Sequence, residues 1–158
     1  MACRSAERGE QAADEIRRAV PDAALDVRVC DLAALDSVTS FAAGVRAAYD
    51  AVDVLCNNAG VMAIPRQETD DGFEMQLGVN HLGHFALTGR LLPALAAGAG
   101  ERRVVTPASG AHHARGIGSS DLPSGRDCGE GSGYGRPTVA SRLSGFDLQR
   151  RPAAAPPA

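Results

Sequence analysis

Apolar residues recur at helical spacing in three segments of the chain. In residues 6–20 and 35–49 they lie three or four positions apart, which predicts two amphipathic helices. Ser5 is a suitable N-cap for the first of these helices, and Pro21 predicts its end. A third, longer helix is predicted over residues 71–97. The residues of this helix expected to face inward are Phe73, Leu77, Phe85, Leu91, Leu92 and Leu95.

Three shorter segments have the pattern of β-strands. Residues 25–29 alternate apolar and polar side chains, which is typical of a strand with one buried face. In residues 52–57 the apolar side chains of Val52, Val54, Leu55 and Cys56 show no polar alternation, which predicts a strand buried on both faces, and residues 103–106 predict a short buried strand. Strands that alternate with helices predict a parallel sheet with right-handed crossovers. The expected fold class is therefore α/β, with a doubly wound parallel sheet.

The regular alternation stops after about residue 115. Residues 116–135 are rich in Gly, Ser and Asp, and residues 152–158 are Pro and Ala only. The second composition is typical of a disordered or extended tail. Because 158 residues fit a single domain, we predict one partial domain over residues 1–151, followed by a tail at 152–158.

The apolar run that begins at Val52 ends in Asn57, Asn58, Ala59 and Gly60. The carboxyl ends of parallel strands form the edge at which open α/β sheets bind ligands. Asn side chains can brace a turn at this edge, and glycine lets the backbone approach a ligand closely. A generic strand-to-loop turn would use the same residue types, so the motif alone leaves both interpretations open.

Composition narrows the function classes. The net charge is −3 and no basic patch is present, which argues against nucleic-acid binding. No apolar run has the length of a membrane span and the start does not resemble a signal peptide, so a cytoplasmic protein is expected. The four cysteines have no metal-ligand spacing. His81 and His84 lie three residues apart on one helical face, which could suit a metal ion, but no acidic residue or cysteine is close by in the sequence, so no metal site is expected. All sixteen basic residues are arginine, which excludes any mechanism that needs a lysine in this chain.

The Asn57–Gly60 motif, together with the run from Asn80 to Phe85, resembles the short-chain dehydrogenase/reductase family, in particular its retinol-dehydrogenase-like branch. This resemblance covers residues 1–115 well and residues 134–151 poorly. It implies a Rossmann-like sheet, a nicotinamide cofactor and hydride transfer between a small carbonyl compound and the corresponding alcohol. Asn57, Asn58, Ala59 and Gly60 would then border the cofactor.

Two further positions bear on the cofactor. Arg4 lies where the family's second strand ends, and a guanidinium there can pair with the 2′-phosphate of NADP, so the resemblance implies NADP over NAD. Asp31, followed by Leu32, matches an acidic position that contacts the adenine amino group in the family. Without the resemblance, Arg4 would be an ordinary surface arginine and Asp31 an ordinary helix cap.

The resemblance also implies three catalytic residues, Asn80, Ser109 and Tyr134. Asn80 would bend its helix and hold a water, Ser109 would donate a hydrogen bond to the substrate carbonyl, and Tyr134 would transfer the proton. The family places a lysine four residues after this tyrosine, where the chain has Thr138. Tyr134 could equally be a chance residue of a Gly-rich loop. His112 and His113 near Ser109 could suggest a hydrolase, but no nucleophile-elbow motif surrounds that serine.

Relative to this family, the sequence lacks the first strand and the Gly-rich turn that receives the cofactor pyrophosphate. In the doubly wound order 3-2-1-4-5 that strand lies between strands two and four, so a gap in the middle of the sheet is expected. The predicted function is an NADP-dependent oxidoreductase whose activity is impaired. The alternatives are a non-catalytic domain that binds a partner, or itself, through the uncovered sheet edge, and an unstable gene-model fragment.

Overall fold

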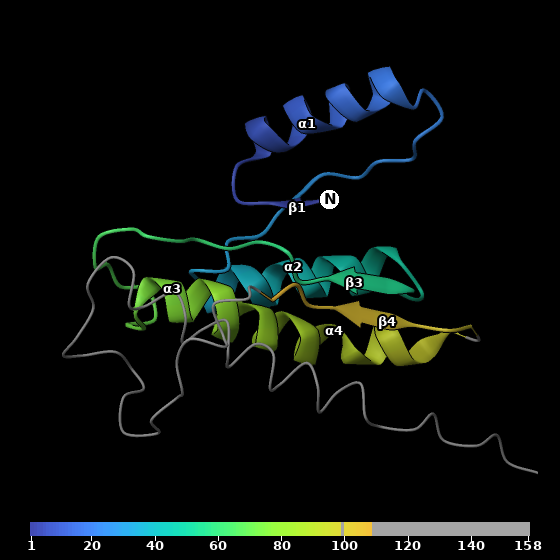
Figure 1. Cartoon of the computed structure of the whole chain (residues 1–158). Helices are drawn as coiled ribbons and strands as arrows, with labels where there is room; N and C mark the ends of the chain where they lie inside the picture. The colour runs from blue at the N-terminus through green and yellow to red at the C-terminus, as the bar shows by residue number, and fades with distance from the viewer. Residues whose placement is uncertain (99, 109–158) are drawn as a thin grey trace, which may run out of the picture.

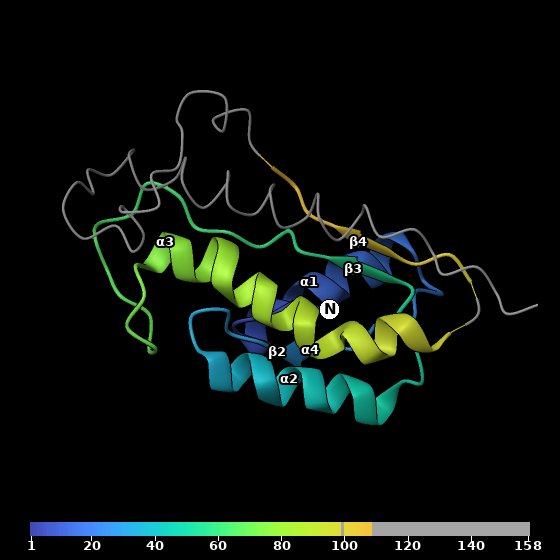
Figure 2. The ribbon, with the colours of Figure 1, turned by 90° about the horizontal axis from the view of Figure 1, so that it is seen from below.

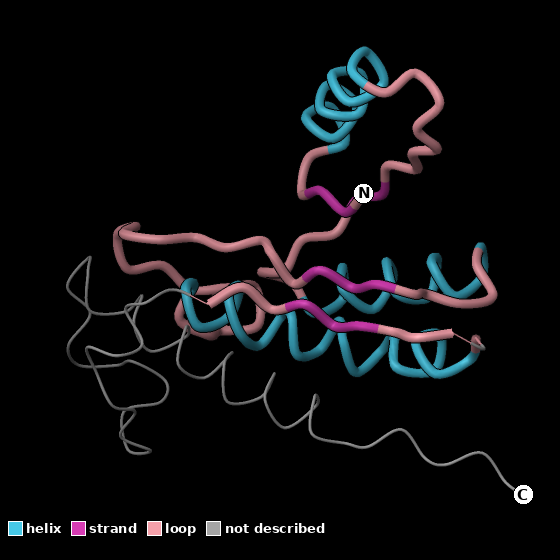
Figure 3. The backbone as a smooth tube through the Cα atoms, turned by 45° about the vertical axis from the view of Figure 1, so that its right-hand side comes forward, coloured by secondary structure: helices cyan, strands magenta, loops and turns pink. Residues whose placement is uncertain are grey.

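Two separate pairs of parallel strands form the sheet region. The computed structural model describes residues 1–98 and 100–108, and in them β1 (Ala2–Cys3) pairs with β2 (Arg28–Val29). The second pair joins β3 (Val54–Cys56) to β4 (Arg103–Val105), with Leu55 opposite Val104. Figure 3 shows the two pairs as separate magenta segments. The predicted parallel α/β arrangement is confirmed, and among the described residues no strand joins the two pairs.

The helices lie on two sides of the strands. α1 (Ala6–Ala19) connects β1 to β2 and lies on one side, whereas α2 (Leu35–Ala48) and α4 (His84–Ala97) lie on the other (Figure 1). Figure 2 shows α2 and α4 running side by side. The Ser5 side chain accepts a hydrogen bond from the backbone N–H of Arg8 at 3.3 Å, which confirms the predicted N-cap.

The helix predicted over residues 71–97 is wrong in its start, and it contains a π-helical segment between two α-helical ones. The first turn, α3 (Met75–Leu77), begins after Glu74, whose carboxylate accepts hydrogen bonds from the backbone N–H groups of Gln76 and Leu77 at 2.9 and 2.8 Å. A π-helical segment, η1 (Gly78–Gly83), then separates α3 from α4. A π-turn accommodates an extra residue, so the apolar pattern changes phase within the segment.

The hydrophobic core lies between α2, α4 and the adjoining strands. Its largest fully buried side chains are Val38 of α2 and Leu91 of α4. Phe85 and Leu92 were expected to face inward, but they are exposed. Their exposed fractions are 60% and 49%. The helical pattern identifies an apolar stripe on α4 but overestimates its width.

The strands are shorter and less covered than predicted. Of residues 25–29 only Arg28 and Val29 are in a strand, and the exposed fraction of Val54 in β3 is 55%. Cys56 is also exposed. The expectation that β3 is buried on both faces is therefore wrong. Only the face toward α2 and α4 is packed in the described part of the chain, through Leu55.

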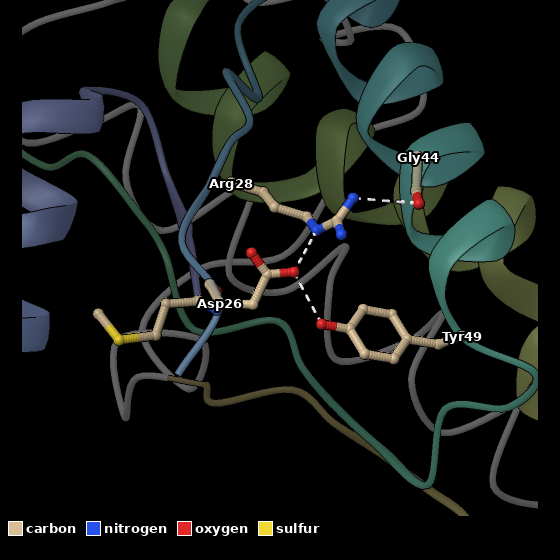
Figure 4. A network of polar contacts seen from close by, with 5 residues as sticks. Asp26, Arg28, Gly44 and Tyr49 are labelled. Atoms are coloured by element: carbon tan, nitrogen blue, oxygen red, sulfur yellow. Dashed lines mark hydrogen bonds and ion pairs between the residues drawn. The ribbon is translucent and has the colours of Figure 1, made fainter. Parts of the chain in front are cut away.

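A polar network joins β2 to α2 (Figure 4). The Arg28 side chain donates to the Asp26 carboxylate at 2.6 Å and to the Gly44 carbonyl at 3.1 Å. The Tyr49 hydroxyl donates to the same carboxylate at 2.7 Å. This hydrogen bond, followed by the one from Arg28, lowers the pKa of Asp26. The network sets the position of β2 relative to the C-terminal half of α2.

Candidate functional site

A cavity of about 630 Å³ lies between the two strand pairs. It is lined by six of the seven residues that the sequence assigns to cofactor binding, namely Arg4, Asp31, Leu32, Asn58, Ala59 and Gly60. These residues come from the ends of β1, β2 and β3. The fold therefore brings together side chains from three separate parts of the sequence, at the edge where open α/β sheets bind ligands.

The turn after β3 is held by Asn80 of η1. The Asn80 side chain donates to the carbonyl of Val61 at 2.8 Å and accepts from the N–H of Val61, also at 2.8 Å. A Cβ on Gly60 would lie 3.2 Å from Asn80 Oδ1, so a side chain there would press on this contact. The side-chain amide of Asn80, predicted to be catalytic, thus braces the turn after β3 by way of Val61.

Asp31 caps a turn and also borders the cavity. One carboxylate oxygen accepts from the backbone N–H of Ala33 at 2.9 Å, and the Asp31 N–H donates to the hydroxyl of Ser37 at 2.9 Å. Asp31 is thus a turn cap before α2, and it also lines the cavity. An ionised carboxylate has about four acceptor sites, so capping leaves capacity for a ligand donor.

Asn57, the seventh predicted cofactor residue, is not among the cavity-lining residues. Its exposed fraction is 7%, and its Nδ2 donates to the hydroxyl of Thr88 on α4 at 3.0 Å. Thr88 in turn donates to the carbonyl of His84 at 2.8 Å. Within the part of the chain that the structure describes, Asn57 Oδ1 has no hydrogen-bond partner. Asn57 therefore anchors the end of β3 to α4.

The sequence analysis did not assign Thr88 or His84 to the site. His84 is buried against the cavity, and its Nδ1 lies 3.2 Å from the carbonyl of Asn80. Burial lowers the pKa of His84, and burial followed by the nearby His84 lowers that of His81. Asn80, His84 and Thr88 are spaced four residues apart, so their common helical face was the signal that could have identified them.

Ser109 and Tyr134, the other two predicted catalytic residues, lie outside the described residues, as does the tail at 152–158. Among residues 1–98 and 100–108 no group of three or more His, Cys, Asp or Glu side chains is arranged to hold a metal ion. The helices of the same residues include none with the length and apolarity needed to cross a bilayer.

A family model for short chain dehydrogenases matches residues 1–120, about three quarters of the chain. The chain belongs to the short-chain dehydrogenase family. Human retinol dehydrogenase 13 is 48% identical over 122 residues, which cover 77% of this chain and 37% of that protein. Human retinol dehydrogenase 12 is 42% identical over 151 residues, which cover 96% of this chain and 48% of that protein. This short-chain dehydrogenase thus spans about half or less of the length of these relatives.

Solved structures support the same assignment. An uncharacterised protein from Mycobacterium paratuberculosis is 43% identical and superposes with a TM-score of 0.81, covering 96% of this chain and 52% of that one. A metagenomic short-chain oxidoreductase in complex with NADP has a TM-score of 0.68 at 22% identity, and the match covers 93% of this chain and 60% of that one. The second likeness shows the shared Rossmann-like fold. The resemblance found in the sequence, and the retinol-dehydrogenase-like branch, are confirmed.

Proposed function

We propose that this chain carries part of the nucleotide site of an NADP-linked oxidoreductase that interconverts carbonyl compounds and alcohols. The observation that supports this most strongly is the single cavity lined by Arg4, Asp31 and the Asn58–Gly60 turn. These residues offer a guanidinium, a carboxylate and exposed backbone at the carboxyl ends of parallel strands, which suits an adenosine phosphate. The names of the retinol dehydrogenases that the chain matches support alcohol and carbonyl substrates.

Arg4 is the basis for proposing NADP rather than NAD. It is exposed and lines the cavity at the end of β1. A guanidinium can form two parallel hydrogen bonds with a phosphate, which only the 2′-phosphorylated cofactor offers at the ribose. On the other side of the cavity, the remaining acceptor sites of Asp31 can receive the adenine amino group.

For catalysis, we propose the roles that the family motif assigns. Ser109 donates a hydrogen bond to the substrate oxygen, and Tyr134 gives the proton to that oxygen during reduction. Bound NADPH would supply the hydride. An unperturbed phenol has a pKa of about 10 and needs a nearby cation to lose its proton near neutral pH. Thr138 cannot provide this charge, and the chain contains no lysine, so we expect impaired turnover.

Ligand-observed NMR of the 158-residue chain with NADPH and NADH tests the nucleotide site. We expect an NADPH dissociation constant weaker than about 1 mM, because only part of the cofactor is contacted. NADH should bind more weakly still. Arg4→Ala should abolish the difference between the two cofactors, whereas Arg8→Ala, at an exposed position on α1, should preserve it. Equal binding of both cofactors to the unmodified chain would contradict the proposed role of Arg4.

A turnover assay tests the catalytic part. With NADPH and a simple aldehyde, we expect no measurable oxidation of the cofactor by the chain, and none by Thr138→Lys alone. The reason is that an added ammonium does not by itself position the hydride donor, and positioning is worth roughly 7–11 kcal/mol. Turnover by the unmodified chain that Tyr134→Phe abolishes would show that activity is intact.

Self-association is a second candidate function, supported by the uncovered strands β3 and β4. Val54 and Val105 are 55% and 42% exposed. Sheet edges and faces left open in this way favour pairing with another copy of the chain. Sedimentation velocity should then show a dimer that Val54→Glu dissociates and that Phe85→Glu, an exposed apolar position on α4, does not. A monomer at all concentrations would exclude this candidate.

A further inference from the structure

The turn that joins β2 to α2, residues 31–34, is held by residues that are distant in the sequence. The N-cap residue of α2 makes no side-chain hydrogen bond to the helix. The cap is supplied by Asp71, whose carboxylate accepts a hydrogen bond from the Leu35 N–H at 2.9 Å. The N–H of the preceding residue, Asp70, donates to the carbonyl of Ala33 at 3.1 Å. Two adjacent residues of the loop before α3 therefore bind this turn at two points.

The same turn carries the carboxylate proposed to contact adenine. Asp31 and Leu32 both line the cavity. The Asp31 carboxylate accepts from the N–H of Ala33 at 2.9 Å, and the carbonyl of Ala33 is the group that Asp70 binds. A single residue, Ala33, thus separates the loop before α3 from the carboxylate at the cavity. A displacement of this loop is expected to move that carboxylate.

The stretch of chain that binds the turn also reaches the opposite wall of the cavity. A Cβ on Gly83 of η1 would lie 2.6 Å from the carbonyl oxygen of Leu32, so the helical backbone packs directly against the turn. Asn80 of η1 exchanges two hydrogen bonds of 2.8 Å with Val61, beside the turn that follows β3. Among the described residues no strand joins the β1–β2 pair to the β3–β4 pair. Residues 70–83 therefore form a direct link between the two sides of the cavity.

We infer that Asp71 is a positioning residue for the adenine end of the nucleotide, because it holds the turn that carries Asp31 against residues 70–83. Its side chain is exposed and is not part of the cavity lining. Asp71 thus acts through the turn and does not touch the ligand. This inference rests on the proposed function, which assigns the Asp31 carboxylate to the adenine amino group.

A purely local helix cap is the alternative role for Asp71. A carboxylate near a helix N-terminus stabilises the helix through its charge, and Asp36 in the first turn of α2 offers such a charge as well. Two features favour positioning. The contact joins residues that are 36 positions apart, and a second hydrogen bond from Asp70 binds the same turn beside it. Two adjacent bonds restrain the orientation of the turn, whereas a single bond would leave it free to rotate.

Amide hydrogen exchange of the full 158-residue chain tests the inference without a ligand. We expect Asp71→Ala to speed exchange of the Leu35 amide, which loses its acceptor, by about tenfold or more. The Ala33 amide, which donates to Asp31, should respond in the same way, whereas a local cap would change Leu35 alone. Asp70→Ala is the matched control, because it removes an adjacent exposed carboxylate and keeps the N–H that binds the turn. It should change neither rate.

A reference amide and a conservative variant separate this effect from unfolding. The Asn57 N–H donates to Val105 in the other strand pair, and its exchange should stay unchanged. Asp71→Asn keeps an oxygen acceptor without the charge, so it should speed exchange of the Leu35 and Ala33 amides by a smaller factor. If Asp71→Ala unfolds the chain, this milder variant decides. Unchanged exchange of Ala33 in Asp71→Asn and in any folded Asp71→Ala chain would overturn the inference.

Ligand-observed NMR measures the consequence for the nucleotide. The two probes are NADPH and its hypoxanthine analogue, in which a carbonyl oxygen replaces the adenine amino group. We expect the unmodified chain to bind NADPH about fivefold more tightly, because the amino group donates to Asp31 and a carbonyl oxygen there cannot. Asp71→Ala should reduce this preference to less than about twofold, and Asp70→Ala should preserve it.

The inference and the proposed function can fail separately in this comparison. A preference for NADPH that Asp71→Ala leaves intact would overturn the role of Asp71 alone, and the proposed nucleotide site would stand. An absence of preference in the unmodified chain would overturn the adenine contact of Asp31 and, with it, the role of Asp71.

Discussion

Asn80 and Val61 exchange two hydrogen bonds, each 2.8 Å long, between the side-chain amide of one and the backbone of the other. This pair links η1 to the turn that follows β3, in which the four consecutive residues from Asn58 to Val61 line the cavity. The contact uses both ends of the amide, which an aspartate or a leucine cannot reproduce. It explains, in structural terms, why an asparagine stands inside a helical segment.

We predict that Asn80→Leu lowers the free energy of unfolding by about 1–3 kcal/mol, because it leaves two partly buried backbone groups of Val61 unpaired. Urea denaturation measures the change. Asn58→Leu is the matched control, since Asn58 is exposed, and it should shift the free energy by less than about 0.5 kcal/mol. Equal effects of the two substitutions would mean that the Asn80–Val61 pair contributes no net stability.

Two glycines of neighbouring helical segments should respond in opposite directions to alanine. A Cβ on Gly83 would lie 2.6 Å from the carbonyl oxygen of Leu32, whereas one on Gly89 would meet nothing within 4 Å. Gly83→Ala should therefore destabilise the chain by about 1–3 kcal/mol, and Gly89→Ala should stabilise it by about 0.5–1 kcal/mol. Thermal unfolding followed by circular dichroism compares them. A loss of stability in both variants would show that the close approach to Leu32 is not the cause.

Stability should decrease as the pH falls below the ordinary histidine value of 6.5. Burial lowers the pKa of both His81 and His84 in the folded chain. Between the ordinary and the lowered pKa the unfolded chain binds more protons, so protonation favours unfolding and stability rises with pH. The urea concentration at the midpoint of unfolding should decrease as the pH is lowered from 7.5 to 5.5.

His84→Gln should flatten this pH dependence, because a neutral amide replaces one of the two groups. The chosen range keeps the Asp26 carboxyl out of the measurement. Its pKa is lowered from 3.8, so its contribution to stability is lost only in more acidic solution. An unchanged slope in His84→Gln would show that His84 does not titrate differently in the folded and unfolded chains.

The cysteines at the ends of β2 and β3 should differ in reactivity. Cys30 is buried, and burial, with a smaller effect of Asp31, raises its pKa to about 11. Cys56 is exposed. At pH 8 the thiolate fraction of Cys30 is then about a thousandth, so iodoacetamide should modify Cys56 far faster. Peptide mapping by mass spectrometry measures both rates. The difference between the two modification rates should disappear in concentrated urea, which unfolds the chain. If it persisted there, its cause would be the local sequence and not burial.

Local features of the sequence determined much of the secondary structure. The helical spacing and the Ser5 cap predicted α1, and the same spacing predicted α2. The apolar run that ends in Asn57 predicted β3 and the ligand-binding edge beside it. Each of these predictions depends on residues within one or two turns of each other, so periodicity and capping were sufficient.

Tertiary structure alone decided which surfaces are covered and how the predicted residues meet. The sequence placed Phe85 and Val54 inside, but both are exposed, because burial depends on what packs against a face. The side chain of Asn57, which the family resemblance places beside the cofactor, donates to Thr88 of α4. The bonds between Asn80 and Val61 and the cavity between two strand pairs join segments that are distant in sequence. Such contacts arise only when the chain packs. The periodicity of the sequence predicts on which face of a helix or strand a residue lies, but not which residue packs against it.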